Sequence, residues 1–134
     1  MSELVHRLLV DGAEIGVSAA VADRLRHRDH VPGFGQAQYP DGDPRCPALL
    51  ALVRAADPDP ARMRTVDEVL DAVGARTGVA PNIDLALGAL MFAAQMPPDA
   101  GEAIFAMARC AGWIAHALEE YEEAPLRFRL RARV

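Results

Sequence analysis

The apolar segment from Leu85 to Ala94 constrains the fold of this chain more than any other. It is the longest apolar run in the sequence; it follows Asn82, a residue type that caps helix N-termini, and it ends before a Pro-Pro pair at 97–98. A helix over residues 83–95 carries one charged residue, Asp84, and is otherwise apolar on all sides. A helix of this kind usually runs through the middle of a core, so the sequence predicts other helices packed around it.

The rest of the chain also has the apolar spacing of helices. Two short helices are predicted in the first 30 residues, the first ending near Gly12, and residues 32–43 are predicted to be a loop rich in Gly and Pro. Asp43-Pro44 is a favourable helix start, and Thr65-Val66-Asp67-Glu68 matches a capping box that would start the next helix. We therefore predict an all-α fold, a compact bundle of five or six helices, forming one domain over residues 1–134.

Composition excludes several classes of protein. The net charge of −5 gives no support for binding to nucleic acid. Cys46 and Cys110 have neither metal-ligand spacing nor a disulfide pattern, which favours free thiols in a reducing compartment and no metal site. The N-terminal segment does not resemble a signal peptide, and the longest apolar run is about half of what a bilayer span needs. We expect a cytoplasmic protein that binds neither nucleic acid nor membrane.

Three charged side chains could carry chemistry. Asp84 lies near the N-terminus of an apolar helix, where a carboxylate can be held ionised and desolvated, as a general base requires. The same residue could simply belong to the cap of its helix. Arg45 and Arg109 could bind a carboxylate bidentately through the planar guanidinium, or could be ordinary surface residues. Residue chemistry alone leaves these alternatives open.

Three ordered motifs, in the segments 31–45, 81–84 and 105–116, together resemble the C-terminal portion of the citrate synthase family, in its actinobacterial form. The segment from Val31 to Arg45 is similar to the family's GFGH loop followed by DPR. Pro81-Asn82-Ile83-Asp84 is similar to the family's PNVD, and the segment from Phe105 to His116 is similar to FA-x-AR-x-x-GWIAH. The resemblance extends from about residue 31 to 131 and implies the fold of the family's small helical domain.

The resemblance implies an acyltransferase of the tricarboxylic acid cycle type, which condenses an acyl-CoA such as acetyl-CoA with oxaloacetate or a similar 2-oxo acid. It implies that Asp84 removes a proton from the acyl methyl group and that Arg45 and Arg109 hold the dicarboxylate. The C-terminal segment 127–133 is similar to a family tail, RLRPRAR, that reaches the neighbouring subunit's site; Arg129 is the matching residue, although a leucine replaces the proline that follows it. No cofactor is implied, with acyl-CoA entering as a substrate.

Gln36 departs from the family pattern, because it stands where the family has a catalytic histidine. Glutamine can donate a neutral hydrogen bond to a developing oxyanion, but it cannot act as a general acid. The family also draws histidines from a large domain, and about 30 residues precede the loop motif here. We therefore expect a truncated chain that is incomplete or inactive alone, and whether it acts as an enzyme with a partner stays open.

Three functions are compatible with these residues. The chain could be the small subunit of a split enzyme with a large-domain partner, a non-catalytic binding or regulatory module, or a truncated gene product; it could also form a homo-oligomer. If a large domain is its natural neighbour, an uncovered apolar surface is expected on the last helix, around Phe105 and Trp113. We expect His116 to be structural and to pack beside Trp113.

Overall fold

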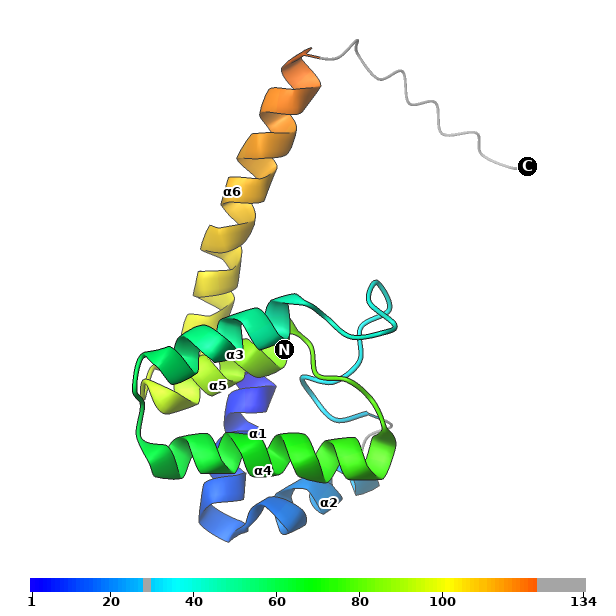
Figure 1. Cartoon of the computed structure of the whole chain (residues 1–134), viewed down its shortest axis with the longest axis vertical. Helices are drawn as coiled ribbons and strands as arrows, with labels where there is room; N and C mark the ends of the chain where they lie inside the picture. Colours follow the sequence, from blue (N-terminus) through cyan, green and yellow to red (C-terminus); the bar gives the residue numbers. More distant parts are fainter. Residues whose placement is uncertain (28–29, 123–134) are drawn as a thin grey trace, which may run out of the picture. The chain divides into compact units, whose positions relative to one another are not determined.

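The regular structure of this chain is helical. The computed structural model describes residues 1–27 and 30–122, and in those ranges it contains six helices and no strand (Figure 1). The helices are α1 (Ser2–Ile15), α2 (Val17–His27), α3 (Arg45–Ala55), α4 (Pro60–Thr77), α5 (Ile83–Ala93) and α6 (Ala100–Glu122). The predicted all-α fold of five or six helices is confirmed.

Contacts within the chain divide it into two units, residues 1–103 and residues 104–134. The first unit contains α1 to α5 and the first turn of α6. The second unit contains the rest of α6 and the C-terminal segment. Within this unit the structure describes residues 104–122.

Helix α5 forms the centre of the first unit. Asn82 begins it, because the Asn82 side-chain oxygen accepts a hydrogen bond of 2.9 Å from the backbone N–H of Asp84. Helices α1, α3 and α4 all pack against α5, and its apolar residues are buried from Leu85 to Phe92 apart from the half-buried Leu90. The prediction of a central apolar helix is confirmed.

Helix α1 crosses α5 at a glycine. A Cβ atom added to Gly88 would overlap two side-chain carbons of Val5, and it would lie 3.2 Å from the backbone nitrogen of His6. The absence of a side chain at this position therefore allows the two backbones to approach closely. Gly74, in the last turn of α4, differs, since no atom lies within 4 Å of the Cβ position there.

Two predicted helix boundaries are wrong. Helix α1 continues past Gly12 to Ile15, and α4 begins at Pro60 instead of after the expected capping box at 65–68. Asp59 accepts a hydrogen bond of 2.8 Å from Ala61 N–H and is followed by a proline at the first helical position, which is a stronger start signal. Thr65 lies inside α4, where its hydroxyl donates to the Ala61 carbonyl (3.2 Å).

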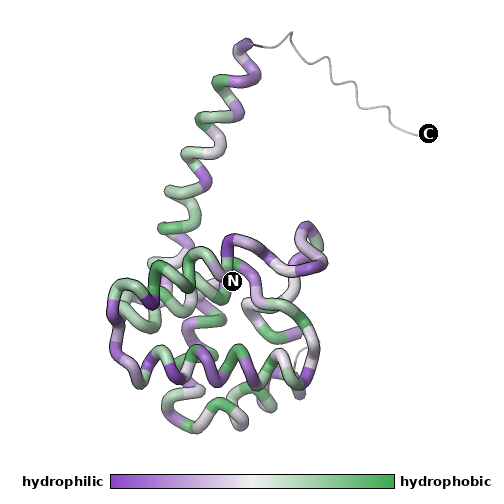
Figure 2. Tube along the Cα trace, viewed as in Figure 1, coloured by the Kyte–Doolittle hydropathy of each residue, from purple (hydrophilic) through white to green (hydrophobic). Residues whose placement is uncertain are grey.

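The described part of the second unit exposes its apolar side chains. Figure 2 shows hydrophobic turns along α6. Trp113 is 59% exposed, Ile114 is 62% exposed and Phe105 is 43% exposed, as expected for an uncovered apolar surface. His116 does not pack as predicted: its side chain is exposed, and its Nδ1 lies 3.4 Å from Glu119 Oε2.

The two cysteines lie in opposite environments. Cys46 is buried beside α5, and burial, with a smaller contribution from the charge of Asp43, raises the pKa of its thiol to about 11. Cys110 is exposed on α6. In residues 1–27 and 30–122 no helix combines the length and the hydrophobicity that a membrane span requires.

Candidate functional site

The loop over residues 31–44 is fastened to the turn that precedes α5. Gly35 N–H donates a hydrogen bond of 2.8 Å to the Ala80 carbonyl, and Asn82 N–H donates one of 2.9 Å to the Gly33 carbonyl. An isolated antiparallel bridge lies between these two bonds. The first two family motifs, 47 residues apart at Gly35 and Asn82, are therefore neighbours in space.

Gly33 has a conformation and a position that other residues cannot easily adopt. Its φ is +86°, and a Cβ atom there would lie 2.8 Å from a methyl group of Val5 and 3.1 Å from the Cα of Leu85. The loop can approach α1 and α5 this closely because position 33 has no side chain.

The side chain of Asn82 joins the loop to the helix. Its oxygen accepts from Asp84 N–H at 2.9 Å, and its amide nitrogen donates to the Gly35 carbonyl at 2.7 Å. Gln36 follows Gly35 directly. The buried amide of Asn82 thus fixes the position of the backbone just before Gln36 relative to the backbone N–H of Asp84.

A second side chain, Asp43, holds Arg45 and the start of α5 at the same time. One carboxylate oxygen accepts from the Arg45 backbone N–H (3.1 Å) and from Arg45 Nε (2.9 Å). The other accepts from Arg45 Nη2 (2.8 Å) and from Ile83 N–H (3.0 Å). The Asp43 side chain is fully buried.

Electrostatics agree with this geometry. The hydrogen bond from the Arg45 guanidinium, aided by those from two backbone N–H groups, lowers the pKa of Asp43 to about 2, although burial acts in the opposite direction. Asp43 in turn raises the pKa of Arg45, and Asp84 adds a smaller contribution of the same sign. The Arg45 guanidinium, the Asp43 carboxylate and the Asp84 carboxylate therefore form one cluster of charges at the N-terminus of α5.

Arg45 is only partly engaged by this cluster. Its guanidinium carbon lies 5.2 Å from the centre of the Tyr39 ring, and 42% of its side chain is exposed. Asp43 occupies the edge of the guanidinium formed by Nε and Nη2. The edge that includes Nη1 is directed to neither of the Asp43 oxygens.

Gln36 lies beside a shallow pocket next to this cluster. The pocket has a volume of about 350 Å³ and lies between the loop and the segment 78–81. Gln36, Tyr39 and Asp43 are among the residues that line it. Gln36 is exposed, and Asp84 is half-buried in the first turn of α5, where the helix N-terminus favours a negative charge.

The predicted site residues fall into three groups. Arg45 and Asp84 lie at the start of α5, to which Asp43 joins Arg45, and Gln36 lines the adjacent pocket that Asp43 also lines. Arg109 belongs to the second unit, in which its guanidinium carbon lies 6.0 Å from the centre of the Trp113 ring. Arg129 lies outside the described residues.

Sequence reasoning missed the roles of Asp43 and Asn82, both of which it interpreted as helix caps. Asn82 does cap α5, whereas the N-cap residue of α3 is Pro44 and not Asp43. Asp43 and Asn82 each bond to a segment 40 or more residues away. Their position inside the two family motifs was the signal that could have revealed a second role.

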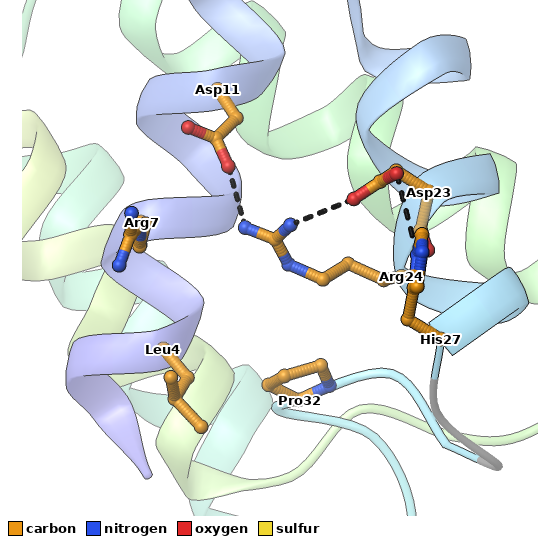
Figure 3. Close-up of a pocket in the computed structure, with 7 residues that line it drawn as sticks. All are labelled: Leu4, Arg7, Asp11, Asp23, Arg24, His27 and Pro32. Atoms are coloured by element: carbon orange, nitrogen blue, oxygen red, sulfur yellow. Dashed lines mark hydrogen bonds and ion pairs between the residues drawn. The ribbon is translucent and has the colours of Figure 1, made fainter.

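A separate pocket lies between α1 and α2, and none of the five predicted site residues lines it (Figure 3). The guanidinium of Arg24 lies between two carboxylates, binding Asp11 through Nη2 and Asp23 through Nη1. His27 Nδ1 lies 2.9 Å from the Asp23 carbonyl oxygen. Arg24 is therefore paired with two of the carboxylates of this pocket, which Arg7 also lines. The described residues also contain no group of three or more His, Cys, Asp or Glu side chains suited to a metal ion.

Comparison with known proteins decides the family. The sequence matches the family described as "Citrate synthase, C-terminal domain" over residues 1–131. The chain belongs to the citrate synthase family. It is similar to a citrate synthase from Haloferax volcanii, with 34% identity over 96% of this chain and 35% of that protein. It is also similar to 2-methylcitrate synthase 2 of Corynebacterium glutamicum, with 32% identity over 92% of this chain and 33% of that protein.

A solved structure gives the same assignment. Citryl-CoA lyase from Hydrogenobacter thermophilus has a TM-score of 0.78 and 26% identity, over 97% of this chain and 53% of that one. This citrate synthase-like chain spans about a third of the length of the curated relatives it matches. The matched part is the C-terminal domain, which fits the position of the motifs.

Proposed function

We propose that this chain supplies one half of an active site that joins an acyl-CoA to a 2-oxo dicarboxylate, or that cleaves the corresponding citryl-type thioester. The observation that carries the proposal is the cluster at the start of α5. Asn82 and Asp43 hold the loop, Arg45 and Asp84 in one arrangement through hydrogen bonds between distant segments.

Each residue of the cluster has a role in this proposal. Asp84, in the first turn of α5, is the base that removes a proton from the acyl carbon next to the thioester. Arg45 binds a carboxylate of the oxo acid, and Arg109 and Arg129 are further arginines for the same substrate by their motifs. Gln36 donates a hydrogen bond to the substrate carbonyl oxygen and leaves the general acid to another group.

The remaining residues of the site belong to a large-domain partner in this proposal. A half site open to solvent cannot exclude water or assemble the full catalytic set. The apolar side chains of α6 provide a surface by which a partner could be held. A cytoplasmic location, where acyl-CoA is available, is part of the same proposal.

A second candidate is a non-catalytic module that binds carboxylates. The exposed Gln36 favours it, because a site without the family's histidine at this position lacks an acid worth about 10²–10⁴-fold in rate. The two candidates differ in whether any partner restores turnover.

Reconstitution separates the two candidates. The chain is mixed with the separately produced remainder of the Haloferax volcanii citrate synthase, and release of CoA is measured with acetyl-CoA and oxaloacetate. We expect no turnover from the chain alone, slow turnover from the mixture, and a rise of about 10²-fold or more with Gln36→His. Gln38→His, a substitution at a neighbouring exposed glutamine, is the matched control and should leave the rate unchanged.

The base assignment is tested in the same mixture. Asp84→Asn should abolish the turnover of the Gln36→His mixture. A mixture that stays inactive even with Gln36→His, while the chain still binds citrate through Arg45, would favour the non-catalytic module. Turnover by the chain alone would contradict the need for a partner.

A further inference from the structure

We propose that Asp43 is a positioning residue that fixes Arg45 so that a ligand carboxylate binds the Nη1–Nη2 edge of the guanidinium and not the Nε edge. This inference rests on the proposed function, in which Arg45 binds the oxo acid. It adds the direction from which the carboxylate arrives and the residue that sets that direction.

The first step is the geometry of the guanidinium. A guanidinium can bind a carboxylate bidentately through its Nε–Nη edge or through its Nη1–Nη2 edge. Asp43 takes the first edge, with one oxygen 2.9 Å from Nε and the other 2.8 Å from Nη2. A second carboxylate can then bind both Nη atoms only from the end of the side chain.

The second step is the anchoring of Asp43 itself. The oxygen that binds Arg45 Nη2 also accepts from Ile83 N–H at 3.0 Å, and Ile83 is the first residue of α5. Asp84 is the next residue. One carboxylate therefore sets the position of the guanidinium relative to the helix turn that carries the proposed base, and the ring of Tyr39 lies near the guanidinium at 5.2 Å.

The third step distinguishes this role from helix capping. Asp59 caps α4 by accepting one hydrogen bond, from Ala61 N–H, and its side chain is exposed. Asp43 is fully buried and uses both oxygens. Burial of a carboxylate costs free energy, and the single hydrogen bond of a cap does not offset that cost. Asp43 has a bidentate bond to the Arg45 guanidinium and bonds from two backbone N–H groups to offset it. The full set of partners is explained by holding Arg45, which a cap does not require.

The pairing of Asp43 with the Nε edge of Arg45 is tested first without any ligand. Nuclear magnetic resonance of arginine side chains reports the exchange of each Nε–H with water, and Arg45→Lys assigns the Arg45 signal. We expect Arg45 Nε–H to exchange at least about tenfold more slowly than that of an exposed arginine such as Arg64. Asp43→Asn should remove this protection, and the matched cap variant Asp59→Asn should retain it. An unprotected Nε–H in the unaltered chain would overturn the proposal, and that measurement needs no variant to fold.

The direction of binding is tested next, with citrate as the probe. We expect citrate to shift the Arg45 Nη signals, to leave Nε–H protected, and to bind about tenfold more weakly to Asp43→Asn than to Asp59→Asn. Loss of Nε–H protection on citrate binding would show that the ligand displaces Asp43, and would overturn the inferred direction. If citrate affects no arginine while Nε–H stays protected, the pairing of Asp43 with Arg45 is supported. The carboxylate-binding role of Arg45 in the proposed function then fails.

Discussion

Helices α5 and α6 both carry many apolar side chains, which lie in opposite environments. The apolar residues of α5 are Ala, Leu, Ile, Met and one Phe, beside a single charged residue, whereas α6 adds three aromatic residues, four Glu and one Arg to its Ala, Ile, Leu and Met. In α5 the side chains from Leu85 to Phe92 are almost all buried, because α1, α3 and α4 pack against it. In α6, residues 105–111 and 113–122 are exposed, including Trp113 and Ile114.

The comparison teaches that an apolar helix specifies burial without specifying the partner that provides it. The partners of α5 lie within the first 80 residues of the same chain. The relatives are about three times as long as this chain, and in the function proposed above the exposed surface of α6 is where a further polypeptide adds contacts. If that view is correct, substitutions in α5 alter the stability of the chain itself, and those in α6 do not.

The largest expected effect comes from truncating a matched pair of side chains. Leu85→Ala should lower the free energy of unfolding by about 3 kcal/mol, because it removes buried methyl groups and leaves a cavity. Ile114→Ala should change it by less than about 0.5 kcal/mol, since the side chain is already exposed. Urea unfolding followed by circular dichroism measures both. A large loss from Ile114→Ala would mean that α6 is packed in the isolated chain, and would break the comparison.

The next effect uses one substitution at two glycines. Gly88→Ala should destabilise the chain by about 2 kcal/mol, because the new methyl group overlaps Val5 where α1 crosses α5. Gly74→Ala should stabilise it by about 0.5–1 kcal/mol, since the position is open and helical and alanine is the better helix former. Midpoints of thermal unfolding should move in opposite directions. A stable Gly88→Ala variant would show that α1 and α5 can separate at little cost.

A third effect, similar in size to that of Gly88→Ala, concerns the anchoring of α5 at its first residue. The folded chain holds the pKa of Asp43 at about 2, below its ordinary value of 3.8. A depressed carboxyl pKa adds stability that is complete above the ordinary value and is lost as the pH falls toward the folded value, here about 2 kcal/mol between pH 4 and pH 2. As the pH falls from 4 to 2, the free energy of unfolding should fall less steeply for Asp43→Asn than for Asp59→Asn. Equal slopes would mean that the carboxylate does not stabilise the start of α5.

Local sequence signals were sufficient for much of the fold. Asn82 and the apolar run after it predicted both the start and the burial of α5, because capping and hydrophobicity act within a few residues. The expected capping box at Thr65 failed for a related reason: two start signals competed, and Asp59 followed by Pro60 is the stronger.

The candidate site could be predicted in its members but not in its connections. The motifs indicated Arg45 and Asp84, and the structure places them in one charge cluster. The hydrogen bonds between Asp43 and Ile83 and between Asn82 and Gly35 span 40 and 47 residues. The motifs could have indicated that Asp43 and Asn82 have a second role, but not which residues they bond. The guanidinium of Arg45 was expected to bind a substrate carboxylate, whereas Asp43 already occupies its Nε–Nη2 edge.

The contrast between the two thiols makes the chain convenient to label. Cys46 is enclosed and its proton is held up to a pKa of about 11, so an alkylating reagent near neutral pH should leave it unmodified. Cys110 projects from α6 three residues before Trp113. A maleimide dye would therefore attach at one place without mutagenesis, and its emission would report directly when another molecule covers that helix.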